Sequence, residues 1–105
     1  MYSLSITIGR NIKDVPMNKD LWTEFKSSVK NELLSLNMEI TVSNSGIGVW
    51  EGIKEENFII QGIRSEPFTD DETETLAKNL SVFCRQYGQD AIAYSIGESI
   101  LAFSE

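Results

Sequence analysis

The chain contains no histidine and a single cysteine, Cys84. The absence of histidine excludes Ser-His-Asp and Cys-His nucleophilic catalysis. Because the chain also has only one cysteine, the usual ligand sets for zinc and iron are missing. One cysteine cannot form an intrachain disulfide, so we expect a reducing, cytoplasmic setting. Because Cys84 falls on the apolar stripe of a predicted helix, it is better interpreted as a small core residue than as a nucleophile. We therefore expect no metal site, no cofactor and no enzymatic activity.

Long apolar runs and basic residues are also lacking. No run approaches the roughly 18 apolar residues that cross a bilayer, and Met1–Ser5 lacks the features of a signal peptide. Only 9 Lys and Arg residues stand against 16 Asp and Glu, for a formal net charge of −7. This charge excludes non-specific binding to nucleic acid, which requires a basic surface. It fits either solubility through self-repulsion or docking onto a basic site of another protein.

The periodicity of apolar residues predicts one strand and two helices. The 105 residues are enough for one core, so residues 1–105 are expected to form a single domain. Strict alternation between Tyr2 and Ile8 predicts a strand, and Asn11–Met17 reads as a loop. A four-residue apolar repeat predicts a helix from the N-cap Asn18 to about Leu36. A capping box of Thr69 with Glu72 begins a second helix, which Gly88 ends.

The segment between the helices favours extended structure. Strands are predicted at Met38–Val42, Ile47–Gly52 and Phe58–Ile63. A turn or bulge is predicted at Ser43–Gly46, and a turn at Lys54–Asn57. Whether Met38–Gly52 forms one kinked strand or two short ones stays open.

After the second helix, Asp90–Ser95 predicts the last regular strand. Gly97–Ser99 predicts a bulge or tight turn, and Ile100–Phe103 an extended end. The order is therefore strand, helix, two or three strands, helix, strand. The simplest closed solution is an α+β ferredoxin-like sandwich, with an antiparallel sheet of four to five strands and both helices on one face.

This topology brings two distant loops to one end of the sheet. The loop after the first strand carries Arg10 and Asn11, and the loop before the last strand carries Tyr87, Gln89 and Asp90. Such a gathering of polar groups is typical of a small-ligand site. Arg10 could bind the carboxylate or phosphate of a small anionic ligand or nucleotide. The alternative is an internal ion pair between Arg10 and Asp90.

A second candidate site is the segment Trp50-Glu51-Gly52. One of Val49 and Trp50 should face the core and the other should not. If Trp50 lies on the open face of the sheet, it would be an exposed aromatic anchor for a partner or planar ligand. Burial of Trp50 in the core is the alternative.

Elements spread over most of the chain carry a resemblance to a class of proteins. They are Ile8–Asn11, Pro16–Met17, Trp22–Phe25, Val49–Gly52 and Tyr87–Ala93. In these elements the chain resembles small phage-encoded accessory proteins of unannotated function. The resemblance implies a compact protein that acts inside a bacterial cell, and it brings no catalytic residues.

Small size, acidity and the phage-like pattern lead to a functional hypothesis. We expect a binding protein that engages or inhibits a host protein. The alternatives are a small-molecule binding protein that uses the corner of Arg10 and Gln89, and a virion or morphogenesis component. The open sheet face and the strand edges offer surfaces for a homodimer.

Overall fold

The computed structural model describes residues 1–98 and 102, without the side chain of Trp50. Within these residues the elements are β1 (Tyr2–Gly9), β2 (Asn11–Ile12), β3 (Val15–Pro16), α1 (Lys19–Ser35), β4 (Glu39–Trp50), β5 (Ile53–Arg64), α2 (Asp70–Gln86) and β6 (Ala93–Glu98). Neither α1 nor α2 is long and apolar enough to cross a membrane.

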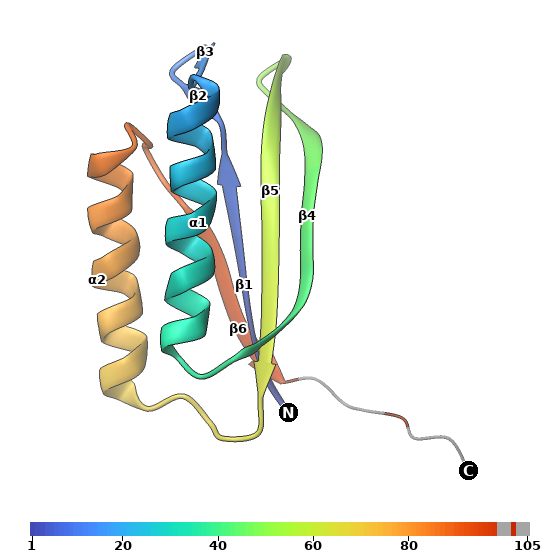
Figure 1. Ribbon diagram of the computed structural model, residues 1–105, viewed down its shortest axis with the longest axis vertical. Helices are drawn as coiled ribbons and strands as arrows, with labels where there is room; N and C mark the ends of the chain where they lie inside the picture. The colour runs from blue at the N-terminus through green and yellow to red at the C-terminus, as the bar shows by residue number, and fades with distance from the viewer. Residues whose placement is uncertain (99–101, 103–105) are drawn as a thin grey trace.

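The main sheet has the order β4-β5-β1-β6, and every neighbouring pair is antiparallel. The first strand thus lies at the centre beside the last, and both helices pack on the same face of the sheet (Figure 1). This is the order and layering of a ferredoxin-like sandwich, so the predicted fold class is confirmed.

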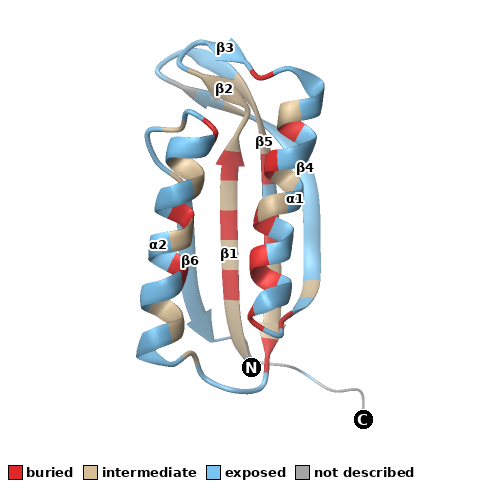
Figure 2. Cartoon of the chain, turned by 60° about the vertical axis from the view of Figure 1, so that its left-hand side comes forward, coloured by how far each residue is buried: buried red, intermediate tan, exposed pale blue. Residues whose placement is uncertain are grey.

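The core lies between the sheet and the two helices. Leu4, Ile6 and Ile8 of β1 are buried, whereas the residues between them are half-buried (Figure 2). The helices direct their apolar stripes at this face, as the alternation and the four-residue repeat predicted. No helix covers the opposite face within the described residues, where β1 presents mainly serine and threonine.

Both helices begin at the predicted residues. The Asn18 side chain accepts a hydrogen bond from the Leu21 N–H at 2.8 Å. Thr69 and Glu72 form the complete capping box at the start of α2. These caps satisfy N–H groups that the first helical turn leaves without a partner.

The β4–β5 hairpin differs from the prediction. β4 is one continuous strand, and its irregularity lies between Ile40 and Val42 instead of at Ser43–Gly46. The turn is formed by Glu51 and Gly52, both with positive φ, and Lys54–Asn57 belongs to β5. A two-residue turn of positive φ matches the twist of the flanking strands, which explains why it forms at this glycine.

Two further segments differ from expectation. The predicted loop Asn11–Met17 contains the short β2–β3 hairpin. The last strand begins at Ala93 instead of Asp90 and continues through Gly97 and Glu98, where a bulge or turn was predicted. The predicted extended end, Ile100–Phe103, falls largely on residues that the structure does not describe.

Arg64 holds the end of β5 against both helices. Its guanidinium donates to the Leu36 carbonyl at 2.8 Å and to both carboxylate oxygens of Glu72 at 2.6 Å. Its Cζ also lies 4.2 Å from the centre of the Phe68 ring. The hydrogen bonds from Arg64 lower the pKa of Glu72 from 4.5 to about 2. A buried guanidinium thus gains the partners that its burial requires.

We predict that Glu72→Gln destabilises the fold in a pH-dependent way. A carboxyl whose pKa falls on folding stabilises the protein above its unfolded pKa and loses that effect as pH falls through the folded value. The stability gap between wild type and Glu72→Gln should be full above pH 4.5 and close toward pH 2. Urea unfolding across this range measures the gap. Glu74→Gln, an exposed acid of the same helix, serves as the control, and a gap independent of pH would contradict the assignment.

Candidate functional site

The candidate site lies where the pairing of β1 with β6 stops. The last matched pair is Thr7 with Ala93, so Ile8 and Gly9 have a strand partner on β5 alone. The chain between α2 and β6 diverges from β1 at this point. The separation leaves an open space at one end of the sheet, which we call the rim pocket.

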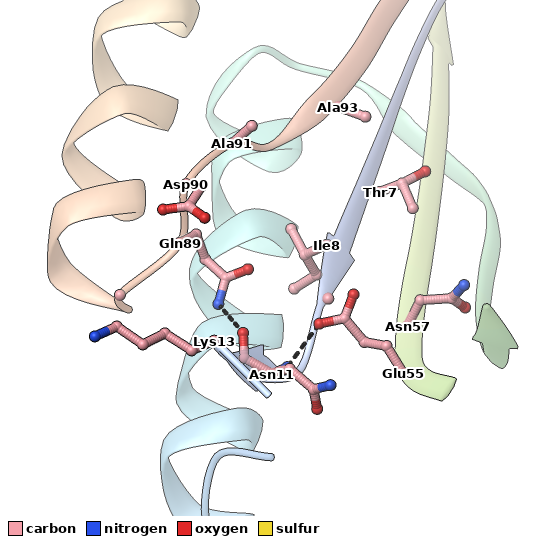
Figure 3. Close-up of a pocket in the computed structure, with 12 residues that line it drawn as sticks. Thr7, Ile8, Asn11, Lys13, Glu55, Asn57, Gln89, Asp90, Ala91 and Ala93 are labelled. Carbon is pink, nitrogen blue, oxygen red and sulfur yellow. Dashed lines mark hydrogen bonds between the residues drawn. The ribbon is translucent and has the colours of Figure 1, made fainter. Parts of the chain in front are cut away.

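The rim pocket has a volume of about 520 Å³ (Figure 3). This volume lies within the range of about 300–1,000 Å³ for small-molecule sites. The end of β1, the β2–β3 hairpin, the start of β5 and the α2–β6 connection all contribute to it. Its lining residues are Thr7, Ile8, Gly9, Asn11, Lys13, Glu55, Asn57, Gly88, Gln89, Asp90, Ala91 and Ala93.

Glu55 is fixed at the floor of the rim pocket. Its carboxylate accepts a hydrogen bond from the Asn11 backbone N–H at 2.8 Å. The same carboxylate lies directly over Gly9, in the space that a Cβ atom at that position would occupy. A glycine at the end of β1 therefore allows the carboxylate to approach the backbone closely.

A second contact joins the two loops across the rim pocket. The Gln89 side-chain amide donates to the Asn11 carbonyl at 3.0 Å, although the residues are 78 positions apart (Figure 3). Gly88, with φ 64°, lies against the Ile12 side chain. The predicted convergence of the two loops is thus observed.

Arg10 does not line the rim pocket. Its guanidinium donates to the Met17 carbonyl at 2.9 Å and to the Glu56 carboxylate at 2.8 Å. The predicted alternative, an ion pair between Arg10 and Asp90, is therefore wrong. The side chain of residue 10 points to the helix face and away from Asp90, because Ile8, two positions earlier, is buried on that face. The bond from Arg10 lowers the pKa of Glu56.

The other predicted site residues are distributed as follows. Asn11, Gln89 and Asp90 line the rim pocket. Tyr87 does not, because it is 1% exposed, stacks on Phe25 with ring centres 4.3 Å apart and shares a hydrogen bond with the Ser28 hydroxyl. Glu51 is exposed in the β4–β5 turn, beside a smaller hollow next to the rim pocket. The predictions for the side chain of Trp50 lie outside what the structure describes.

Sequence reasoning missed Glu55, Lys13 and Asn57. Glu55 and Asn57 were assigned to a turn, because a run of polar residues was interpreted as solvated. In the structure the burial of β5 alternates, so Glu55 and Asn57 lie on the face opposite the buried Phe58 and Ile60. The sequence of this segment does not alternate, because two acids are adjacent and three apolar residues follow one another at 58–60, so it gave no signal for this placement.

The charges around the rim pocket favour a cation. Two carboxylates, Glu55 and Asp90, stand against one ammonium group, that of Lys13. Asn11, Asn57 and the pocket's backbone groups add hydrogen-bonding capacity. Among the described residues, no group of three or more acids or cysteines is placed to hold a metal ion. The arrangement suits an organic ligand with a positive centre and several hydroxyl or amine groups.

Comparisons with known proteins concern the fold. No protein-family model and no curated protein sequence matches the chain. Among solved structures, a phage SAM lyase in the apo state is 16% identical with a TM-score of 0.58, over 91% of this chain and 78% of the lyase. A phage SAM lyase in complex with S-methyl-5'-thioadenosine gives 16% and 0.59, over 92% of this chain and 80% of that one.

A third solved structure extends the comparison beyond phages. The C-terminal domain of MgtC from Mycobacterium tuberculosis is 13% identical with a TM-score of 0.52, over 97% of this chain and 92% of that one. At these identities the likeness shows a shared fold. A fold of this kind is thus shared by a protein named as an enzyme and by a domain whose name states no activity.

We predict that Gly9→Ala displaces Glu55 from its position in the rim pocket. The new Cβ would collide with the carboxylate, which must then leave the Asn11 N–H. Loss of this charge-assisted hydrogen bond should cost about 1–2 kcal/mol of unfolding free energy. Faster hydrogen exchange at the Asn11 amide would report the loss directly. Gly97→Ala is the control, because its Cβ would meet only the Ser3 hydroxyl at 3.7 Å, and equal effects of both changes would contradict the account.

Proposed function

We propose that the rim pocket binds a small nucleoside-type molecule that carries a positive charge, with S-adenosylmethionine as the first candidate. The observation that carries the proposal is the pair of carboxylates, Glu55 and Asp90, at a pocket of ligand size. This ligand replaces the anion that was expected at Arg10. Arg10 is paired with Glu56 and is not among the residues that line the pocket.

The chemistry of S-adenosylmethionine matches the lining. Its sulfonium and amino groups are cationic, and the carboxylates of Glu55 and Asp90 can neutralise them. Its ribose hydroxyls and adenine amine require the mixed donors and acceptors that Asn11 and Asn57 provide. Lys13, exposed at the mouth of the pocket, is the available partner for the carboxylate of the methionine moiety.

The solved structures support this choice of ligand. A protein of the same fold is named as a SAM lyase and has been solved with S-methyl-5'-thioadenosine, a nucleoside thioether. That this lyase is a phage protein also supports the phage origin inferred from the sequence elements. A phage protein that removes or sequesters a host metabolite would act in the bacterial cytoplasm, as we expected for this chain.

Binding and turnover are separate parts of the proposal. Absence of histidine argued against an enzyme, but a carboxylate can also accept the proton that an elimination releases, while the carbon–sulfur bond of the sulfonium breaks and a neutral thioether leaves. Glu55 and Asp90 are the carboxylates placed at the pocket. We propose ligand binding as the function, and chromatography of the ligand after incubation will show whether it is also cleaved.

A second proposal retains the engagement of a host protein. The formal net charge of −7 favours a partner with a basic surface. Exposed acids on the outer sides of the helices, among them Asp20, Glu24, Asp70, Asp71 and Glu74, are the candidate contacts. Such a complex should form at low salt and weaken at high salt. Capture experiments that recover no specific protein at low salt would overturn it.

We predict that calorimetric titration detects binding of S-adenosylmethionine, and that Glu55→Gln and Asp90→Asn each weaken it about tenfold, the effect of losing ~1.4 kcal/mol of interaction. Neutral S-adenosylhomocysteine should bind more weakly than S-adenosylmethionine, because it lacks the sulfonium charge. ATP, an anion, should not bind.

Two control variants test the placement of the ligand. Glu74→Gln removes an exposed acid from the second turn of α2, far from the end of the helix that leads to the pocket, and should leave affinity unchanged. Arg10→Gln should alter stability more than affinity. If both pocket variants bind as well as wild type, or if ATP binds as tightly as S-adenosylmethionine, the proposed site is wrong.

A further inference from the structure

β4 forms one edge of the sheet, and beyond the irregularity between Ile40 and Val42 it has no protection against further pairing. Within the described part of the chain it pairs with β5 alone. From Ile40 to Trp50 it contains no charged residue and no proline, and Thr41–Ile47 are all exposed. Natural edge strands are usually short or carry lysine, proline or other charges that prevent pairing with another chain. A long, uncharged edge in a chain with a net charge of −7 is therefore a feature to explain.

The outward-facing backbone groups of β4 follow from the sheet register. The Arg10 N–H donates a hydrogen bond to the Glu56 carbonyl, so the backbone of Glu56 faces β1. In an antiparallel sheet every second residue of a strand bonds to the same neighbour, so the alternate residues of β5 that share the parity of Glu56 bond to β1. The residues between them bond to β4. The residues of β4 opposite those that bond to β1 direct their N–H and C=O groups away from the sheet. They are Ser43, Ser45, Ile47 and Val49.

We propose that β4 pairs with β4 of a second copy of the chain, in antiparallel fashion, to join the two sheets across a two-fold axis. A second copy is favoured over a charged partner because this edge offers no charge for a charged partner to recognise. It is also a surface on which two chains of net charge −7 can approach without placing carboxylates opposite one another. Glu39 and Glu51 lie just outside the two ends of this stretch, and the other acids of the hairpin, Glu55 and Glu56, lie on β5.

One register matches all the outward-facing groups. In this register Gly46 lies opposite Gly46 of the other copy. Ser45 of each copy then pairs with Ile47 of the other, and Ser43 with Val49, on both sides of the two-fold axis. We call this contact between the two β4 strands the join. The two Gly46 residues then form a non-hydrogen-bonded pair, in which the side chains of opposite residues come closest to one another. The two Ile47 side chains become diagonal neighbours. Ile47 is 74% exposed and Val49 66% exposed in the single chain, and both lie in the paired stretch.

The test is the oligomeric state of the full chain, measured by sedimentation and light scattering over a range of concentrations. Wild type should show twice the mass of one chain at high concentration. The dimer fraction should rise with salt, because screening reduces the repulsion between two acidic chains. Ser45→Pro removes an outward N–H without touching the β4–β5 bonds and should be monomeric, whereas Ser45→Ala keeps the N–H and should remain dimeric.

A second variant covers the case in which Ser45→Pro fails to fold. Ile47→Glu places two carboxylates side by side at the centre of the join and should also be monomeric, with unchanged circular dichroism. Wild type that is monomeric at all concentrations would overturn self-pairing. Dimers that survive both Ser45→Pro and Ile47→Glu would overturn it as well, because another surface would then hold the copies together. The test of ligand binding remains separate, because neither Ser45 nor Ile47 lines the rim pocket.

Discussion

The rest of the structure depends on how β1 pairs with its two neighbouring strands, because one pairing is longer than the other. β1 is bonded to β5 along its whole length, but to β6 only as far as Thr7. The buried alternation of Leu4, Ile6 and Ile8 fixes the register of the strand, because a shift by one residue would turn this apolar set to solvent. The rim pocket exists because the chain leaves α2 too far from β1 to complete the pairing, and the Gln89–Asn11 hydrogen bond spans the gap instead.

The distribution of charge at this end of the sheet follows from the same register. Consecutive residues of a strand point to opposite faces, so Glu55 and Glu56 separate. Glu56 reaches Arg10 on the helix side, whereas Glu55 lies over Gly9 at the rim pocket. The one guanidinium near the pocket is thereby used internally, and the pocket is left with more negative than positive groups. The proposal of a cationic ligand rests on this separation of two adjacent glutamates.

The sequence predicted the layers, the caps at Asn18 and Thr69, and the meeting of the two loops, because each depends on periodicity, local hydrogen bonding or topology. It did not predict the partner of Arg10. That partner depends on how far β5 extends beyond β1, and a run of polar residues at Lys54–Asn57 concealed the extension. Tyr87 was placed in the site by its position in a loop, but an aromatic ring at a helix end has more to gain from the core beside Phe25.

The proposed ligand, a positively charged nucleoside, should occupy the rim pocket. Amide chemical shifts recorded during titration with S-adenosylmethionine test this placement most directly, because they locate the ligand without any substitution. The largest changes should fall on Gly9, Asn11 and Gln89, whereas the amides of the first turn of α2, Asp70–Glu72, should not move. Changes concentrated on the helices, or no changes at saturating ligand, would contradict this placement of the ligand.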